Sequence, residues 1–346
     1  MDQKIYVLLL VYNGWKDTLE CLESVLKSDH KNYQIVVVDN NSPNNSLDHI
    51  AAWAEGKEMA NVDNPMLAEL STPHSKKPLN YILYNKFQAT QGGVREKEDK
   101  LINPIVLIQS GENKGFAAGN NIGIKYILSK NDAHHVWLLN NDTVIEPSTL
   151  TNLTDTASQY ISKGEKVGII GNKLMHYNAP KVIQSVGGVY NKWLATTKHV
   201  GAFEADAGQY NNNSVSENID YPIGASLFVS VAFIQDVGLL CEDYFLYFEE
   251  LDWTIRGKEK GWRLGYCWKA NVFHKEGGSI GSSSHAKQKS ELADYYGSRN
   301  RIVFTKKFYK SKIWSVKFGF IFVVFNRIKR GQSSRLGLIV KAMLNS

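Results

Sequence analysis

The sequence predicts an α/β protein with a mostly parallel β-sheet flanked by helices. Residues 5–11, 35–38 and 136–139 are short, continuous apolar runs, which is typical of strands that are buried on both faces. Apolar residues at helical spacing follow the first run, and residues 115–128 predict a helix with a glycine-rich entry. Strands that alternate with helices favour parallel pairing. With 346 residues and 43% hydrophobic content, the chain can bury a full core.

Two stretches interrupt this alternation. Along the chain we further expect a strand at 105–108, a helix beyond Pro147, a strand at 167–170 and a helix over 244–260. Residues 55–104 are rich in proline and charge, so we interpret them as an insertion in a crossover, partly ordered around 81–84. Residues 176–220 are expected to be rich in loops.

Charge divides the chain into two parts. The stretch after Asp294 contains 12 Lys or Arg and no Asp or Glu, whereas the preceding residues carry 28 basic against 34 acidic side chains. Within it, the apolar run 318–325 is too short to cross a bilayer but can lie in its surface. We expect one domain over 1–290 and a basic, amphipathic helical tail over 291–346 at a membrane surface. A solvated basic face, or packing of the run on the domain, is the alternative.

The chain shows neither an export signal nor a disulfide pattern. The run 5–11 is too short to span a bilayer and lacks a cleavage site. Cys21, Cys241 and Cys267 are odd in number and far apart, without a CxxC pair. A cytoplasmic protein, peripheral on the inner face of the membrane, is therefore expected. Nucleic acid is not expected as a partner, because no nucleic-acid motif accompanies the charge.

Polar residues stand where several predicted strands end, and they are Tyr12, Asn13, Asp39, Asn40, Asn140, Asn141 and Asp142. Ligands of open parallel sheets bind beyond the carboxyl ends of the strands. Asp39 could accept a hydrogen bond from a nucleobase or cap the next helix. Asp142 could reach a divalent cation held by a diphosphate, or it could cap a turn.

Three carboxylates and one histidine complete the candidates. Glu249, Glu250 and Asp252 lie on a predicted helix, where they could stabilise its N-terminus. Alternatively, clustering raises the pKa of at least one of them, which suits a general base. His274 ends a β-like run before a glycine pair, and it could be a structural hydrogen-bond partner or a metal ligand.

In this order along one chain, these residues resemble the family 2 glycosyltransferases, and within them the bacterial rhamnosyltransferase-like group that builds cell-surface polysaccharides. The resemblance spans residues 5 to about 305 without the insertion. It rests on LLLVYN at 8–13, VVVDNNS at 36–42, NKGFAAGNN at 113–121, LLNND at 138–142, GAS at 224–226, YFEELDW at 247–253, Arg256, GW at 261–262, His274 with GGS at 277–279, and YGSRN at 296–300.

The resemblance implies a GT-A fold with a Rossmann-like sheet over 1–290, and an inverting transfer of a hexose. It implies that Asp39 reads a pyrimidine base and that Glu250 is the catalytic base. Asp142, as the last acid of the family's Asp-x-Asp motif, would bind Mg²⁺ or Mn²⁺ together with His274. The other nucleotide-sugar residues would be Val11, Tyr12, Asn13, Asn113, Gly115, Asn120, Asn121, Asn140 and Asn141. Supporting or acceptor-orienting residues would be Glu249, Asp252, Trp253, Gly224 and Arg299.

Two departures from the family pattern affect this interpretation. Asn140 replaces the first acid of the Asp-x-Asp motif, which removes one carboxylate from the metal site. Glu250 stands where the family usually has Asp. The group likeness favours dTDP-L-rhamnose as donor, with other UDP- or GDP-sugars as alternatives, and a saccharide acceptor on a polyprenyl diphosphate, as in O-antigen synthesis.

Two other functions are weighed against a glycosyltransferase. A nucleotidyltransferase normally has a glycine-rich, Arg-containing loop after its first strand, and residues 11–14 read Val-Tyr-Asn-Gly instead. A non-catalytic scaffold on the membrane would explain Asn140. The joint presence of Asp39, Asp142, Glu250 and His274 argues against a scaffold.

Overall fold

The computed structural model describes residues 3–72, 76–276 and 290–346. Its strands are β1 (Ile5–Val11), β2 (Tyr33–Asp39), β3 (Tyr81–Asn85), β4 (Ile105–Gln109), β5 (His135–Asn140), β6 (Thr143–Ile145), β7 (Val167–His176), β8 (Ala179–Ser185), β9 (Gly187–Asn191), β10 (Thr196–Val200), β11 (Ser226–Ser230) and β12 (Arg263–His274). Its α-helices are α1 (Trp15–Leu26), α2 (Ser46–Ala54), α3 (Ala68–Ser71), α4 (Lys86–Thr90), α5 (Arg95–Glu98), α6 (Phe116–Ser129), α7 (Thr149–Ser162), α8 (Val231–Val237), α9 (Glu249–Glu259), α10 (Glu291–Phe308), α11 (Ile313–Lys329) and α12 (Leu336–Leu344).

Most of the strands form one large sheet. Over the described residues its order is β3-β4-β2-β1-β5-β11-β7-β12-β6, with β8 paired to β7. The pairs from β3 to β5 are all parallel, while β11 runs antiparallel to both of its neighbours. The predicted α/β class with a mostly parallel, helix-flanked sheet is therefore confirmed.

Helices cover both faces of the sheet, because the central strands are apolar at every position. In β1, Tyr6 and Leu8 belong to the core layer beneath α6, whereas Val7 and Leu9 belong to the layer beneath α1 and α2. Close packing of α6 depends on Gly123, where an added Cβ would lie 2.4 Å from Leu8 Cδ1. This packing fixes the position of α6 relative to β1, and therefore relative to the residues that follow β1.

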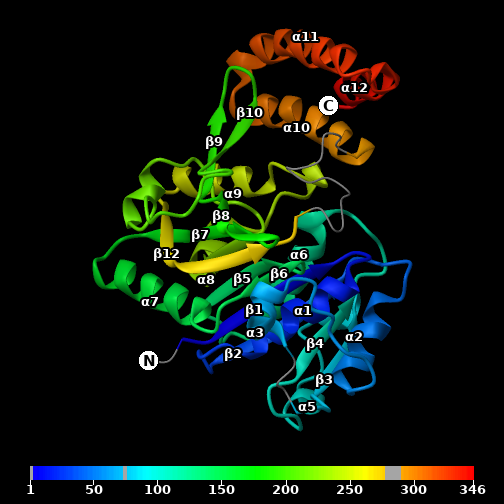
Figure 1. Ribbon diagram of the computed structural model, residues 1–346, viewed down its shortest axis with the longest axis vertical. Helices are drawn as coiled ribbons and strands as arrows, with labels where there is room; N and C mark the ends of the chain where they lie inside the picture. The colour runs from blue at the N-terminus through cyan, green and yellow to red at the C-terminus, as the bar shows by residue number, and fades with distance from the viewer. Residues whose placement is uncertain (1–2, 73–75, 277–289) are drawn as a thin grey trace.

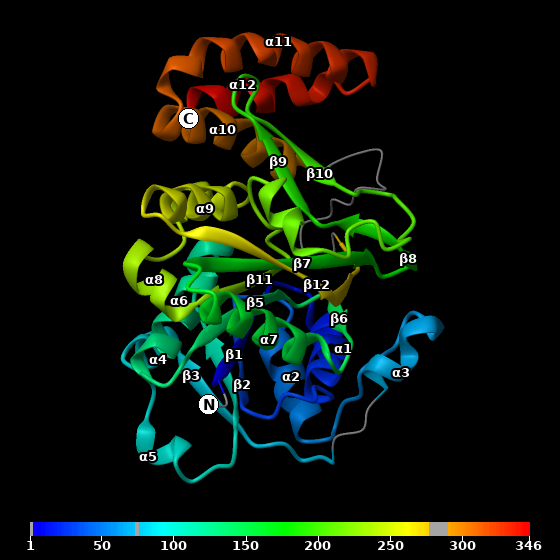
Figure 2. The ribbon, with the colours of Figure 1, turned by 90° about the vertical axis from the view of Figure 1, so that its left-hand side faces the viewer.

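The C-terminal helices form a separate layer above the sheet. Figures 1 and 2 show α10, α11 and α12 stacked at one end of the molecule, with the β9–β10 hairpin rising to meet them. A small core of Ala195, Ile302, Val316, Phe320 and Ile339 joins the hairpin to these helices. The basic tail is thus helical, as predicted. Over the described residues, no helix is long and apolar enough to cross a membrane.

Three sequence predictions need correction. The segment 176–220 is rich in loops only over 201–220, because its first part forms β8 and the β9–β10 hairpin. The helix predicted over 244–260 begins only at Glu249, after a turn in which Phe245, Tyr247 and Phe248 have positive φ angles. In the segment 55–104, the order predicted around 81–84 is confirmed by β3, which pairs with β4, but the segment is more ordered than expected because it also contains α3, α4 and α5.

Candidate functional site

A cavity of about 630 Å³ opens at the carboxyl ends of β1 and β5. Its other sides are formed by the start of α9, by β10 and by α10. Predicted site residues that line it are Tyr12, Asn113, Gly115, Asn140, Asn141, Asp142, Gly224, Glu249, Glu250 and His274. The sheet topology therefore brings together the strand-end residues and the carboxylate cluster, which are far apart in sequence.

The part of the cavity beside β1 and α6 is shaped by an amide network. Asn40 Nδ2 donates to Asn113 Oδ1 at 2.9 Å and to the Gly115 carbonyl at 3.2 Å. Gly115 has a φ of 93°, and an added Cβ there would collide with the Phe245 backbone. Only glycine allows this close approach of α6 to the loop before α9. Asn40, a strand-end candidate without an assigned role, lines the cavity.

Several residues assigned to the nucleotide lie outside the lining. Asp39 is buried at the end of β2, where Gln109 Nε2 donates to its Oδ2 at 2.9 Å. The Asn13 backbone N–H donates to Ser42 Oγ at 2.9 Å, which ties the loop after β1 to the loop after β2. Val11 is fully buried in the core. Val11 and Asp39 end the strands β1 and β2, and Asn13 follows β1, but none of the three is among the residues that line the cavity.

Asn120 and Asn121 have structural partners inside the protein. Asn120 Nδ2 donates to the Phe116 carbonyl at 2.9 Å within α6. Asn121 Nδ2 donates to the Leu240 carbonyl at 3.0 Å, and its Oδ1 accepts the Leu240 N–H at 3.1 Å. Asn121 therefore holds α6 against the segment that leads toward α9, so it helps to position the walls of the cavity.

Asp142 and His274 meet where β12 pairs with β6. Asp142 Oδ1 lies 3.1 Å from His274 Nε2, and both side chains are buried. On the other side of the ring, Nδ1 lies 2.8 Å from Gln184 Oε1, which assigns the proton of the neutral imidazole to Nδ1. In the protonated ring Nε2–H donates to Asp142 Oδ1, whereas in the neutral ring the Nε2 lone pair is free to bind a cation. Although burial opposes both charges, their interaction lowers the pKa of Asp142 and raises that of His274.

This pair fits two ligands of one divalent cation. Neighbouring ligands at about 2.1 Å from an octahedral ion are roughly 3 Å apart, which matches the observed separation. The described residues contain no cluster of three or more His, Cys, Asp or Glu that could hold a metal. Asn140 lies beside the pair, with Nδ2 3.3 Å from His274 Nε2. The part of the chain that the structure describes thus offers this carboxylate–imidazole pair, and phosphate oxygens or water would have to provide the other ligands.

Asn141 faces away from this pair. Its Nδ2 donates to Thr18 Oγ1 at 2.9 Å and to the Gly14 carbonyl at 3.1 Å. These bonds anchor the end of β5 to the first turn of α1. Asn141 therefore holds Asp142 in place.

Glu249 and Glu250 begin α9 at the opposite side of the cavity. Burial raises the pKa of Glu250 to about 7, and burial together with the charge of Glu250 raises the pKa of Glu249 well above its usual range. Glu249 Oε2 is buried without a hydrogen-bond partner among the described residues. An added Cβ at Gly224 would lie 3.7 Å from Glu250 Oε1, so Gly224 leaves space beside that carboxylate.

Asn300 of α10 holds the strained turn that precedes α9. Its Nδ2 donates to the carbonyls of Tyr244, Leu246 and Tyr247 at 2.9, 2.7 and 3.1 Å. Phe245 stacks on Tyr296 of the same helix with ring centroids 4.5 Å apart. Three bonds from one buried amide stabilise positive φ angles that non-glycine residues rarely adopt.

The remaining members of the predicted cluster lie behind α9. Asp252 is fully buried, and Arg256, Lys307 and the Tyr244 hydroxyl all bond to its carboxylate. Trp253 is in the core, and its Nε1 donates to the Gly238 carbonyl at 2.7 Å. The Arg299 guanidinium donates to the Asp243 carbonyl at 2.8 Å. Asp252, Trp253 and Arg299 hold α9 in position and do not line the cavity.

Three residues that shape the site were missed from the sequence. Gln184 comes from the segment expected to be loop, Asn300 sits in the YGSRN motif without an assigned role, and Arg301 follows it. Arg301 brings a permanent positive charge to the cavity from α10. The motif itself was the available signal for Asn300, while Gln184 had none.

Comparison with known proteins shows which family the N-terminal part of the chain resembles. Residues 6–63 match glycosyl transferase family 2, a segment that contains β1 and β2. Agl10 of Haloferax volcanii, a hexosyltransferase of low-salt glycan biosynthesis, is 23% identical over 217 residues, which cover 62% of this chain and 64% of that relative. The chain thus aligns with less than two thirds of that relative's length. The predicted resemblance to family 2 is confirmed.

Solved structures give the fold. The mannosyltransferase PcManGT of Pyrobaculum calidifontis, in complex with GDP-Man and Mn²⁺, covers 100% of this chain and 87% of its own, with 11% identity and a TM-score of 0.51. GalNAc-T7, solved with UDP, GalNAc and Mn²⁺, covers 86% of this chain and 50% of its own, with 14% identity and a TM-score of 0.50. These likenesses confirm the GT-A fold.

Proposed function

We propose that this GT-A protein, whose N-terminal strands match glycosyl transferase family 2, is an inverting glycosyltransferase that moves a hexose from a nucleotide sugar to a saccharide. The observation that carries this proposal is that Asp142, His274 and Glu250 line the same cavity. Transfer of a sugar needs a group that stabilises the leaving diphosphate and a base for the attacking hydroxyl, and this cavity has candidates for both.

In the proposed reaction, the Glu250 carboxylate accepts the proton of an acceptor hydroxyl. The hydroxyl oxygen forms a bond to the anomeric carbon while the bond to the phosphate oxygen breaks. A pKa of about 7 lets Glu250 be ionised and still basic near neutral pH. Burial and the charge of Glu250 raise the pKa of Glu249, which favours its uncharged form and limits the negative charge beside Glu250.

Asp142 and His274 are the residues that would hold a divalent cation. Bound there, Mg²⁺ or Mn²⁺ would neutralise the charge of the diphosphate. An imidazole ligand favours Mn²⁺ over Mg²⁺, which prefers oxygen ligands. Gln184 fixes the His274 ring for this role through the bond to Nδ1.

For the donor we propose dTDP-L-rhamnose, on the basis of the resemblance to the rhamnosyltransferase-like group. A GDP- or UDP-hexose is the second candidate, supported by GDP-Man in PcManGT and by the hexosyltransferase Agl10. Thermal-shift screening of the three nucleotide-sugar classes with Mn²⁺, followed by hydrolysis assays of the best donor, tests both. If no nucleotide sugar raises the melting temperature or is hydrolysed, the glycosyltransferase proposal is wrong.

For the acceptor we propose a saccharide on a polyprenyl diphosphate, reached at a membrane surface through α11. One face of this helix is more than half exposed and carries Trp314, Phe318, Ile321, Phe322, Phe325 and Ile328. Lys310, Lys317, Lys329 and Arg330 flank it, and no acidic residue follows Asp294. Aromatic residues between cations match an anionic bilayer surface, where each cation contributes about 1 kcal/mol.

Vesicle flotation tests this attachment. We expect the full chain to float with phosphatidylglycerol vesicles, and the double substitution Phe318→Ser with Phe322→Ser to reduce the floating fraction at least tenfold. Phe87→Ser is the matched control, since Phe87 is equally exposed but lies on α4, at the far end of the molecule from α11 (Figure 2). Equal flotation of the double variant would refute the role of α11.

A further inference from the structure

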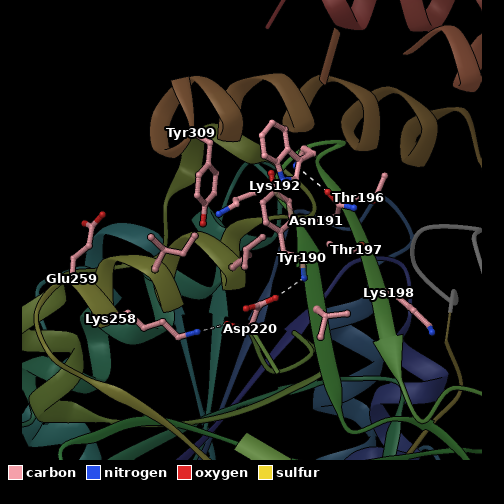
Figure 3. Close-up of a pocket in the computed structure, with 14 residues that line it drawn as sticks. Tyr190, Asn191, Lys192, Thr196, Thr197, Lys198, Asp220, Lys258, Glu259 and Tyr309 are labelled. Carbon is pink, nitrogen blue, oxygen red and sulfur yellow. Dashed lines mark hydrogen bonds between the residues drawn. The ribbon is translucent and has the colours of Figure 1, made fainter. Parts of the chain in front are cut away.

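A second groove, of about 980 Å³, lies between the β9–β10 hairpin and α9. Figure 3 shows its side chains: Tyr190 and Asn191 come from β9, Thr196 and Thr197 from β10, and Lys258 and Glu259 from α9. Tyr309, which follows α10, closes the end nearest the C-terminal helices. Nothing in the proposed reaction uses this groove.

Aromatic rings form part of its surface. Tyr190 stacks on Tyr309 with centroids 5.8 Å apart, and both rings pack near Phe304. Trp193, at the tip of the hairpin, is 53% exposed although Lys312 Nζ lies 3.5 Å from its ring centroid. Rings that are fixed on one side and open on the other can pack against the C–H faces of sugar rings.

The polar groups of the groove have mixed character. Its lining contains three lysines, Lys192, Lys198 and Lys258, and two carboxylates, Asp220 and Glu259, with hydroxyl and amide groups between them. Two of these groups already have partners, since Asp220 Oδ2 accepts the Tyr190 N–H at 2.7 Å and Lys258 Nζ donates to the Asp220 carbonyl at 3.1 Å. Donors and acceptors of both signs beside open aromatic rings suit a hydroxyl-rich ligand.

The groove adjoins the catalytic cavity. Thr197 and Leu251 line both spaces. Leu251 directly follows Glu250, the proposed base, so the groove begins beside the point where the acceptor hydroxyl would react. A linear saccharide that presents its end to Glu250 could therefore continue past Thr197 into the groove.

We infer that this groove binds the sugar units of the acceptor that lie beyond the reacting hydroxyl, and so makes the protein prefer oligosaccharide over monosaccharide acceptors. This inference rests on the proposed function, because it takes the catalytic cavity as the place of reaction. Trp193 and Tyr309 provide the ring surfaces, and Lys192 and Glu259 provide the hydrogen bonds to sugar hydroxyls.

Binding measurements without a donor test the inference. The probes are maltohexaose, mannohexaose and chitohexaose, each compared with its monosaccharide by saturation-transfer NMR and fluorescence titration. We expect at least one hexasaccharide to bind fivefold or more tightly than its monosaccharide. Trp193→Ala and Glu259→Gln should each remove that preference. Trp314→Ala, which removes an exposed tryptophan outside the groove, should keep it.

Two results would overturn the inference: no hexasaccharide preference in the unmodified chain, or a preference that survives both groove substitutions. Tighter binding of pyrophosphate than of any hexasaccharide in the groove, lost on Lys192→Gln, would also overturn it. Nucleotide-sugar hydrolysis is measured on the same preparation. Hydrolysis without oligosaccharide preference refutes the groove alone, whereas groove-dependent preference without nucleotide binding refutes the proposed function alone.

Discussion

The catalytic cavity has two walls that are held in place by different means. On the strand wall, Tyr12 and Asp142 stand just beyond β1 and β5, whose parallel register fixes where the strands end. On the helix wall, Glu249 and Glu250 start α9 after a turn whose shape depends on Asn300 of α10. The sheet therefore positions the residues that would bind the leaving group, whereas the proposed general base is positioned by a contact from α10.

The largest expected effect concerns the base on the helix wall. Glu250→Gln keeps the size of the side chain but removes its ability to accept a proton, so transfer should fall by about 10²- to 10⁴-fold. Donor affinity, measured by titration calorimetry, should stay within twofold. Glu249→Gln is the matched control and should cost less than tenfold, because burial and the charge of Glu250 raise the pKa of Glu249 and so favour an uncharged form that glutamine resembles. If both variants lose activity equally, the base assignment is wrong.

The next effect concerns the strand wall. Asp142→Ala or His274→Ala should weaken Mn²⁺-dependent binding of the nucleoside diphosphate by roughly 10- to 100-fold, since each removes one of two ligands. Titration with and without Mn²⁺ checks this, and binding without metal should change little. Gln184→Leu should produce a smaller loss of the same kind. A loss that is equal in both conditions would show that the pair does not act through a metal.

A smaller effect is expected from a substitution that disturbs the helix wall and leaves the strand wall intact. Asn300→Ala leaves three carbonyls of the turn before α9 without their donor, which should lower the free energy of unfolding by about 1–3 kcal/mol. Transfer should fall, while diphosphate affinity stays constant, because the strand wall is untouched. Denaturant unfolding and steady-state kinetics measure the two quantities. Asn326→Ala, at an exposed position of α11, is the control and should change neither.

The mildest test changes only pH. Glu250 must be ionised to accept a proton, and burial raises its pKa to about 7. At saturating donor and Mn²⁺, kcat should therefore be low at pH 5, rise through pH 7 and level off above it. Nucleoside diphosphate affinity at fixed Mn²⁺ is measured separately and should weaken as His274 gains a proton, because its interaction with Asp142 raises its pKa and a proton competes with the cation. A flat rate profile between pH 5 and 8 would contradict the assignment of Glu250.

The strand wall was predictable because its signals are local. Each buried strand of a parallel sheet is a continuous apolar run, and the polar residue after the run must lie at the ligand-binding edge. The sequence therefore predicted the α/β class, the strand ends at Tyr12 and Asp142, and the basic helical tail. The order of motifs then allowed the GT-A fold to be expected from the resemblance.

Only the tertiary structure decided which members of each motif face the cavity. Asp252 belongs to the same helix start as Glu250, yet helical geometry turns it inward to Arg256 and Lys307. Gln184 and Asn300 act across long sequence separations, so no local pattern could assign them. The sequence by itself determined which strands and helices are expected and which polar residues stand at their ends, because apolar runs and periodicity are patterns of neighbouring residues. Which of those groups meet depends on contacts between distant segments, and these exist only in the folded chain.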